Sequence, residues 1–300
     1  MKKEELLQGI QAGKYDEMLV NLYGQEALTA QKQRYSQAVE KFATLYPERG
    51  DMEVFSAPGR TEVCGNHTDH QHGKVLAAAI NLDAVAVVGF HEDGVIRLHS
   101  EGYPAITVEL SDLAINEAEH GTTKALIRGM AAQFADKGVK IGGFDAYVTS
   151  DVLGGSGLSS SAAFEVLIGT ILDIHYNKGA VGAVDIAKMG QFAENKYFGK
   201  NCGLMDQMVS SVGGFVFIDF ADPTKPVIDK HVCDFAAAGI SLCITDTKGS
   251  HADLTADYVS IPVEMKSVAA HFGKEVLHEV AETDFSAEIG ALRGKASDRA

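Results

Sequence analysis

The chain has 300 residues, of which 46% are hydrophobic and 22% are charged, so it is long enough for two domains with proper cores. Its 41 acidic residues outnumber its 26 lysines and arginines, which gives a net charge of −15 at pH 7. A general surface for nucleic acid or for an anionic membrane needs clustered positive charge. This balance therefore excludes both, and any phosphate site must be local.

The four cysteines show neither the spacing of a metal site nor that of a disulfide framework. The segment Met1–Leu7 lacks the apolar stretch of a secretory signal, and no run approaches the roughly 18 apolar residues of a membrane span. We therefore expect a reduced, cytoplasmic protein with neither a membrane nor a nucleic acid as partner.

Residues 1–50 mix charged residues, Gln and Ala with apolar positions such as Leu6 and Leu19, which is typical of short helices. We interpret them as an N-terminal helical extension that looks like an appendage. The first convincing strand is Glu53–Ala57, and Pro58 is expected to end it.

The next predicted elements are strands joined by a turn. Val75–Phe90 is almost continuously apolar, Glu92–Gly94 has turn composition, and Val95–His99 alternates. Further helices are predicted at about Thr122–Lys137, Ser159–Asn177, Val184–Phe198 and 253–283, and further strands at Phe144–Ser150, Gly213–Asp219 and Ile240–Thr247. This pattern predicts a mixed α/β domain over residues 51–235 and the start of a second domain over 236–300.

A polar segment, Arg60–Gly73, follows the first predicted strand. Its potential metal ligands are His67, Asp69, His70 and His72. Their spacing offers neither a helical i, i+4 pair nor a Cys/His framework, which argues against a metal site. A solvated loop is a second possibility, and a polar substrate pocket is the interpretation that we favour.

The segment Asp151–Ala163 joins a predicted strand, a glycine-rich loop and an apolar helix. Its glycines permit tight turns that present backbone N–H groups to an anion, and Ser159–Ser161 open a helix whose first N–H groups lack partners. The loop is neither a Walker A sequence nor a Rossmann fingerprint, and turn-plus-cap chemistry could also explain it. We interpret it as a phosphate cradle.

The segment Asn201–Gln207 places a carboxylate and an amide in otherwise apolar company. Asp206 could simply cap a helix there. A catalytic role is the alternative, and the segment alone does not decide between the two.

Together, three motifs in this order resemble the GHMP small-molecule kinases. Gly154–Ala163 resembles their ATP-phosphate loop, Ala57–Asp69 looks like the N-terminal signature of the galactokinase branch, and Cys202–Gln207 is similar to that branch's catalytic segment. The likeness extends from about Ser56 to about Tyr258. It implies an α+β fold in which an N-terminal domain related to a ribosomal protein meets a ferredoxin-like C-terminal domain at the active site. Because the chain is shorter than is usual in the family and a third glycine-rich motif is not found, we expect only the first part of that C-terminal domain.

The resemblance also implies ATP and Mg²⁺ as cofactors, a sugar as substrate, and a role for each matching residue. Asp206 would be the catalytic base with Arg60 as its partner, and Ser161 and Glu194 would hold Mg²⁺. The residues expected to bind the sugar are Asn66, His67, Asp69, Gly203 and Tyr258. Those expected to bind the nucleotide are Gly154, Gly155, Ser156, Gly157, Leu158, Ser159, Ser160 and Ser161. Phosphoryl transfer needs placement and charge neutralisation, which these residue types can supply.

The chain departs from the family pattern at three positions, since Asn66 replaces a Glu, Leu153 a Pro and His70 a Tyr. The leading hypothesis is an ATP-dependent 1-kinase for galactose or a close relative. A kinase for a modified hexose, such as a 2-acetamido sugar, and a non-catalytic sugar-sensing regulator are alternatives. Another branch of the family, acting on an amino-acid or isoprenoid alcohol, is disfavoured by the Arg60–Asp69 signature. The oligomeric state stays open.

Overall fold

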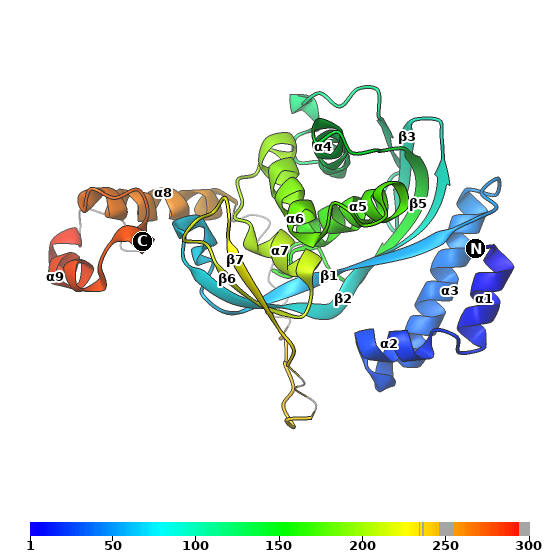
Figure 1. The fold of residues 1–300 in the computed structure, drawn as a ribbon, viewed down its shortest axis with the longest axis horizontal. Helices are drawn as coiled ribbons and strands as arrows, with labels where there is room; N and C mark the ends of the chain where they lie inside the picture. The colour runs from blue at the N-terminus through cyan, green and yellow to red at the C-terminus, as the bar shows by residue number, and fades with distance from the viewer. Residues whose placement is uncertain (234, 236, 246–254, 294–300) are drawn as a thin grey trace.

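A computed structural model describes residues 1–233, 235, 237–245 and 255–293. Within this part of the chain, seven strands form one mixed sheet, and helices pack against both of its faces (Figure 1). The predicted mixed α/β fold is therefore confirmed. Among the described residues, no helix combines the length and the apolar character that crossing a membrane requires.

The sheet is organised around β2, which is 18 residues long and runs from Lys74 to His91. Its partners are antiparallel: β1 (Glu53–Cys64) along most of its length, β5 (Gly143–Ser150) along its second half and β6 (Phe215–Asp219) along its first residues. The remaining strands extend the sheet outwards: β3 (Val95–Ser100) next to β5, β4 (Ile106–Glu109) next to β3, and β7 (Val227–His231) next to β6.

The apolar run in β2 is explained by burial on both of its faces. Ala84, Ala86 and Val88 belong to the cluster that includes helices α4 (Thr123–Asp136) and α5 (Ser160–Asn177). Val85 and Val87 belong to the clusters formed with the N-terminal helices. A strand with two covered faces needs apolar side chains at consecutive positions, so the alternation of a half-buried strand is absent here.

The prediction that Pro58 ends the first strand was wrong. β1 continues through Pro58 to Cys64, with an irregularity in its pairing between Pro58 and Arg60. Among the described residues, β1 pairs with β2 alone, so it is an edge strand, and an edge tolerates the missing N–H of proline.

The turn at Glu92–Gly94 does join two strands, but they are not paired with each other. β5 lies between β2 and β3, antiparallel to the first and parallel to the second. A short turn determines only that the chain reverses. The longer connection through α4 brings β5 back between the two strands, and this insertion has no local sequence signal.

Most helices of the chain lie close to the ranges predicted for them. In the N-terminal region they are α1 (Lys3–Gln11), α2 (Asp16–Tyr23) and α3 (Leu28–Leu45), with a 3₁₀ turn at Gln25–Ala27. Residues 1–50 are thus helical, as expected, and they cover one face of the sheet rather than standing apart from it. After α5 come α6 (Ala183–Phe192), a π-helical turn (Ala193–Phe198) and α7 (Met205–Val212).

The C-terminal predictions need correction. Of the strand predicted at Ile240–Thr247, residues 240–245 have no regular structure and 246–247 lie outside the described residues. The helix predicted over 253–283 is interrupted. α8 (Thr255–His271) ends before Gly273 at positive φ, and a 3₁₀ turn (Leu277–Glu279) and α9 (Glu282–Leu292) follow. β4 and β7, which lack a clear alternation, were not predicted.

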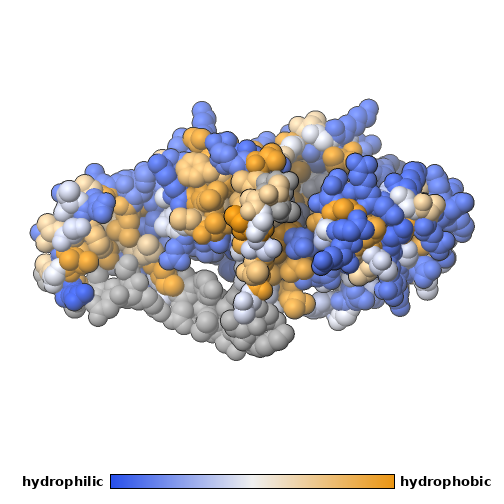
Figure 2. All heavy atoms as spheres, turned by 90° about the horizontal axis from the view of Figure 1, so that it is seen from below, coloured by the Kyte–Doolittle hydropathy of each residue, from blue (hydrophilic) through white to orange (hydrophobic). Residues whose placement is uncertain are grey.

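The sheet carries exposed apolar side chains at the edge formed by β7. β7 is an edge strand, and Val227 and Val232, in and beside it, are largely exposed. Figure 2 shows apolar side chains gathered near the middle of the face seen from below, the side toward which β6 and β7 project in Figure 1. Exposed apolar surface of this kind is typical of a region that contacts further protein.

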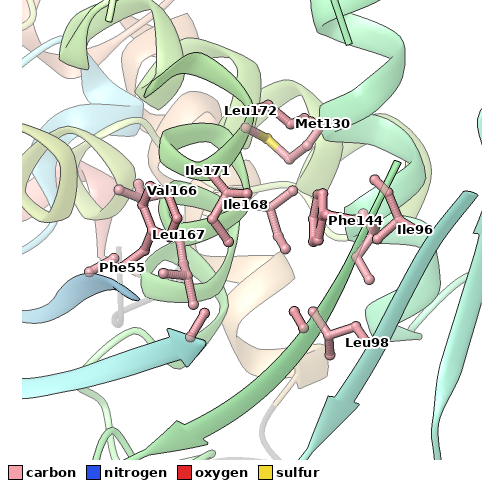
Figure 3. Packing of buried hydrophobic residues seen from close by; sticks show 14 of the residues in the cluster. Phe55, Ile96, Leu98, Met130, Phe144, Val166, Leu167, Ile168, Ile171 and Leu172 are labelled. Atoms are coloured by element: carbon pink, nitrogen blue, oxygen red, sulfur yellow. The ribbon is translucent and has the colours of Figure 1, made fainter. Parts of the chain in front are cut away.

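The largest core cluster anchors α5 on the sheet. It includes Phe55, Ile96, Leu98 and Phe144 from the strands, Met130 from α4, and Val166, Leu167, Ile168, Ile171 and Leu172 from α5 (Figure 3). Because interiors are packed as densely as crystals, this contact holds α5, and with it the loop that precedes α5, in one place.

We predict that Ile168→Ala lowers the free energy of unfolding by about 2–5 kcal/mol, because it leaves a cavity at a side chain with no exposed surface. Ile174, on the same helix, is 48% exposed, and Ile174→Ala is the matched control with an expected change below about 1 kcal/mol. Urea denaturation of both variants measures the difference. Equal losses would mean that the face of α5 assigned to the core is wrong.

Candidate active site

Arg60, in β1, is the residue on which three distant segments converge. Its side chain is bidentate to Asp206, with Nε 2.8 Å from Oδ1 and Nη2 2.6 Å from Oδ2. The two residues are 146 positions apart in the chain, and Asp206 lies in the first turn of α7. Arg60 is only 6% exposed, whereas the side chain of Asp206 is 25% exposed, so the guanidinium is shielded from water and the carboxylate is partly open to it. A bidentate arginine–carboxylate pair is both strong and specific in orientation.

Arg60 also holds the glycine-rich loop. Its Nη1 donates to the carbonyl of Gly157 at 2.7 Å, and its backbone N–H donates to the carbonyl of Leu158 at 3.1 Å. Close contact is required here, since a Cβ on Gly59 would lie 2.7 Å from the Leu158 oxygen. Gly157 has a φ of +79°, which few other residues adopt. Gly59 and Arg60, both in β1, therefore fix the position of the loop.

The start of α5 reaches the same carboxylate. Ser159, the residue before α5, has a φ of +60° and donates its hydroxyl hydrogen to Oδ2 of Asp206. The phosphate-loop segment and the start of α7 thus share one acceptor. An open helix N-terminus beside this acceptor is a favourable place for an anion such as a phosphate.

The environment of Asp206 determines its protonation. Burial alone would raise the pKa of this carboxyl. The charge of Arg60, the nearby His67 and the hydrogen bonds from Ser159 and Arg60 outweigh burial, so the pKa lies below the ordinary value of 3.8. Asp206 is therefore a carboxylate at neutral pH, able to accept a proton from a bound hydroxyl.

A second group of oxygens lies behind the loop. Ser161 donates to Oε1 of Glu194 at 3.1 Å, and Nζ of Lys200 lies 3.2 Å from the same oxygen. Nε2 of Gln207 donates to the other oxygen, Oε2, at 2.8 Å. A hydroxyl and a carboxylate oxygen at this separation suit a hard cation such as Mg²⁺, which takes oxygen ligands and keeps several waters.

No larger metal site is present in the described ranges, where three or more His, Cys, Asp or Glu side chains are nowhere grouped to hold an ion. His67, Asp69, His70 and His72 thus do not form one. A mostly solvated, phosphate-bridged Mg²⁺ needs fewer protein ligands than such a group supplies.

Asp69 provides an unused acceptor on the other side of Arg60. It lies in a 3₁₀ turn (Thr68–Gln71), and its Oδ2 accepts the Met205 N–H at 3.2 Å, while Oδ1 is buried without a hydrogen-bond partner. Burial raises the pKa of Asp69. Gly203 is packed so tightly on it that a Cβ would lie 1.7 Å from Oδ2. An orphaned buried oxygen is costly, and a ligand hydroxyl would satisfy it.

A cavity of about 180 Å³ opens next to this acceptor, lined by Asp69, Cys202, Gly203, His70, Gln191 and Phe220 among others. His67 lies between Asp69 and Arg60, with Nδ1 3.9 Å from Oδ1 of Asp69 and Nε2 3.4 Å from Nη2 of Arg60. Polar groups that converge on a small cavity are the usual arrangement for binding a small polar molecule.

The structure brings most of the predicted site residues together. Arg60, Asp206, His67, Asp69 and Gly203 are connected by the contacts above, as are Gly157, Leu158, Ser159, Ser161 and Glu194. The loop residues Gly154, Gly155, Ser156 and Ser160 follow on the same segment. Asn66 is exposed, and Tyr258 lies in α8 at a position whose side chain is outside the described part of the structure. Leu153 is 63% exposed.

The sequence analysis missed Glu62. Its two carboxylate oxygens accept the backbone N–H of His67 at 2.9 and 3.1 Å, which holds the loop containing Asn66 and His67. Asn66 and His67 have φ values of +54° and +57°, and Asn tolerates this left-handed region better than most residues. The replacement of a Glu by Asn66 therefore suits the backbone here. The turn that brings Glu62 to His67 has no signal in the motif.

Glu165 and Gln207 were missed as well. Nε2 of Gln207 lies between the two glutamates, 3.0 Å from Oε2 of Glu165 and 2.8 Å from Oε2 of Glu194, and all three residues are buried. Burial, followed by the charge of Glu194, raises the pKa of Glu165 well above the ordinary value of 4.5. The apolar pattern of the sequence places residue 165 in a helix, but it does not indicate that the carboxyl of Glu165 lies near the carboxyl of Glu194.

We predict that Glu165→Gln stabilises the protein increasingly as pH rises. The folded state holds the Glu165 proton more tightly than the unfolded chain, so this group lowers the free energy of unfolding as pH rises above about 4.5, and a Gln cannot do so. We therefore expect the gain in the free energy of unfolding over the native protein to be larger at pH 8 than at pH 4.5.

Denaturation series at several pH values, with Glu40→Gln on the exposed face of α3 as the control, measure this gain. A gain that is the same at every pH, or that is matched by the control, would show that Glu165 is ionised in the folded protein.

Comparison with known proteins adds to this geometry. Residues 40–90 match the galactokinase galactose-binding signature, and residues 125–214 match the N-terminal domain of GHMP kinases. The chain is 34% identical over 258 residues to a galactokinase of Streptomyces coelicolor, which covers 84% of this chain and 65% of the relative. It is 36% identical over 215 residues to a galactokinase of Lactiplantibacillus plantarum, which covers 70% of this chain and 51% of the relative.

Among solved structures, the Lactococcus lactis galactokinase complexed with galactose aligns with a TM-score of 0.69 at 24% identity, covering 84% of this chain and 66% of that one. This likeness shows a common fold. The chain spans 65% and 51% of the length of the two curated relatives above.

Proposed function

We propose, from the matches to the galactokinase galactose-binding signature and to the GHMP kinase N-terminal domain, that the chain is a GHMP kinase of the galactokinase branch and a cytoplasmic ATP-dependent sugar 1-kinase. It transfers the γ-phosphoryl group of ATP to the anomeric hydroxyl of galactose or a close relative. The observation that supports this most directly is the bidentate pair of the buried Arg60 and the partly buried Asp206 beside the glycine-rich loop. It joins a proton acceptor, a fixed positive charge and a phosphate-binding loop at one point.

In the proposed reaction, Asp206 accepts the proton of the anomeric hydroxyl while that oxygen forms a bond to the γ-phosphorus. The bond from the γ-phosphorus to the bridging oxygen of ADP breaks, and the products are a sugar 1-phosphate and ADP. A carboxylate with a lowered pKa is a weak base. It is sufficient because phosphoryl transfer passes through a loose transition state in which the nucleophile needs little activation.

Arg60 has two tasks in this scheme. It keeps Asp206 ionised and oriented, and its charge lies where the transferring phosphoryl group gains negative charge. Its hydrogen bond to the Gly157 carbonyl keeps the loop at a constant distance from the base. Placement of this kind contributes much of the rate in phosphoryl transfer, since the reacting atoms must be in line.

The loop Gly154–Ser161 is proposed to hold the ATP phosphates, and Ser161 and Glu194 to hold Mg²⁺. When bound, Mg²⁺ neutralises charge on the β- and γ-phosphates. Because Gln207 occupies Oε2 of Glu194, this side chain has one oxygen, Oε1, to offer. Lys200 competes for the same oxygen at 3.2 Å and would move aside or contact a phosphate instead.

For the sugar, we propose that His67, Asp69 and Gly203 form the pocket, with Asn66 and Tyr258 at its edge. The unpartnered Oδ1 of Asp69 and the cavity beside it support a polyhydroxylated ligand. Asn66 is uncharged and exposed. This observation favours a second candidate substrate, a modified hexose such as a 2-acetamido sugar.

The function is tested by ADP release over a panel of free sugars, with the native protein and Asp206→Asn. We expect the substitution to lower kcat by orders of magnitude and to leave the sugar dissociation constant within a few-fold, because the proton acceptor is lost while shape is retained. Single-turnover rates and calorimetric sugar binding measure the two effects. A protein that binds sugar but releases ADP with none of them would instead be a sugar-sensing regulator, and equal losses in rate and affinity would make Asp206 structural.

The specificity proposal concerns Asn66. Asn66→Asp adds a carboxylate and keeps both side-chain length and tolerance of positive φ, whereas Asn66→Glu adds length at a backbone cost. A charged acceptor contributes about 1.5–3 kcal/mol against about 1 for a neutral one, so Asn66→Asp should raise kcat/KM for galactose about tenfold over its 2-acetamido analogue.

Glu62→Gln is the companion variant, because it weakens the hold on His67 without altering position 66. It should raise KM for every sugar alike. If neither variant at position 66 changes the ranking of sugars, Asn66 does not govern specificity.

A further inference from the structure

A buried polar cluster joins the N-terminal helices to the sheet. Its centre is Asp83 in β2, whose side chain is 4% exposed. The Tyr23 hydroxyl donates to Oδ2 of Asp83 at 2.6 Å, Tyr23 and Tyr35 share a hydrogen bond at 2.7 Å, and the Ser56 hydroxyl donates to the same Oδ2. These contacts draw α2, α3 and β1 onto one carboxylate. Helix packing alone would require only apolar side chains here.

Arg34, in α3, makes the charged contacts of this cluster. Its Nη1 lies 2.7 Å from Oδ1 of Asp83 and 3.0 Å from Oδ2 of Asp151. Its Nη2 donates to the backbone carbonyl of Asp83 at 2.9 Å and to that of Thr149 at 3.4 Å. One guanidinium therefore contacts β2, the end of β5 and the residue that follows β5.

This position matters because Asp151 begins the connection to the glycine-rich loop. The Asp151 N–H donates to the carbonyl of Asp83 at 2.9 Å, so backbone and side chain are both tied to the same place. Val152 follows and packs where a Cβ on Gly59 would meet it at 3.1 Å. A Cβ on Gly154 or on Gly157 would meet nothing within 4 Å. The loop thus has open space at these two positions and is held at its first residues.

We propose that Arg34 is a positioning residue for the nucleotide-binding loop, acting through Asp151 from the N-terminal helices. The proposal rests on the proposed function, since it takes the loop to bind the ATP phosphates. Arg60 fixes the later part of the loop through Gly157 and Leu158. Arg34 fixes the residue from which the loop departs, so the two arginines set both ends of the segment between β5 and α5.

The chain offers a matched control in Arg49. This residue also belongs to the N-terminal region, and it also pairs with a buried carboxylate of the sheet, Asp145 in β5. Asp145 faces Gly89 in the β2–β5 ladder, at the opposite end of β5 from Asp151. Loss of either arginine leaves a buried carboxylate with one cation fewer. Of the two arginines, only Arg34 contacts the start of the loop.

Three variants separate positioning from general stability: Arg34→Gln, Arg49→Gln and Asp151→Asn. Asp151 is 41% exposed, so Asp151→Asn removes the loop end of the ion pair and leaves the pair of Arg34 with Asp83 in place. We expect Arg34→Gln and Asp151→Asn to raise the dissociation constant of ATP about three- to tenfold, with sugar affinity unchanged. Arg49→Gln should leave both affinities unchanged, and the double variant of Arg34 and Asp151 should bind ATP no more weakly than Arg34→Gln.

Calorimetric titration with ATP and with galactose, and KM for each, measure these effects at a temperature below the melting point of each variant. Unchanged ATP affinity in Asp151→Asn, or an equal loss in Arg49→Gln, would overturn the proposal even if Arg34→Gln fails to fold. A native protein that does not bind ATP would instead overturn the proposed function. The two failures are therefore distinguishable.

Discussion

The contact between Arg60 and Asp206 is the constraint on which the site depends. A guanidinium that is almost fully buried on an edge strand is costly unless a carboxylate meets it in the right orientation. That requirement ties β1 to the first turn of α7, and the hydrogen bonds to Gly157 and from Ser159 extend it to the start of α5. The charges are therefore arranged before any ligand arrives, which is the condition under which electrostatic stabilisation of a transition state is most effective.

The sheet explains how these segments keep their places. β2 is buried on both faces, by α5 on one and by the N-terminal helices on the other, so the elements that carry the site are packed against a common strand. The face toward α5 is lined by apolar side chains, whereas the other face contains the carboxylates Asp83 and Asp145, each paired with an arginine from the N-terminal region. The N-terminal region thus binds the sheet through charge as well as through apolar contact.

The acidic groups around the loop show how environment separates residues of the same chemical type. Asp206 is stabilised as an anion by Arg60, whereas Glu165 has only an amide and another carboxylate nearby, and its pKa is raised. Glu194 accepts hydrogen bonds from Ser161 and Lys200 on one oxygen and from Gln207 on the other. The raised pKa of Glu165 reflects burial first and then the charge of Glu194 nearby.

The local chemistry could be predicted from the amino-acid sequence: the glycine-rich loop before α5, the helices with clear periodicity, and the motif residues that lie around Arg60. This was possible because loops, caps and amphipathic faces are encoded by neighbouring residues. Three features became visible only in the folded chain: β5 enters between β2 and β3, Pro58 lies within an edge strand, and Glu62, Glu165 and Arg34 hold groups near the site. These features depend on contacts between segments far apart in the chain. The type of one residue says little about which distant residue will contact it in the folded protein.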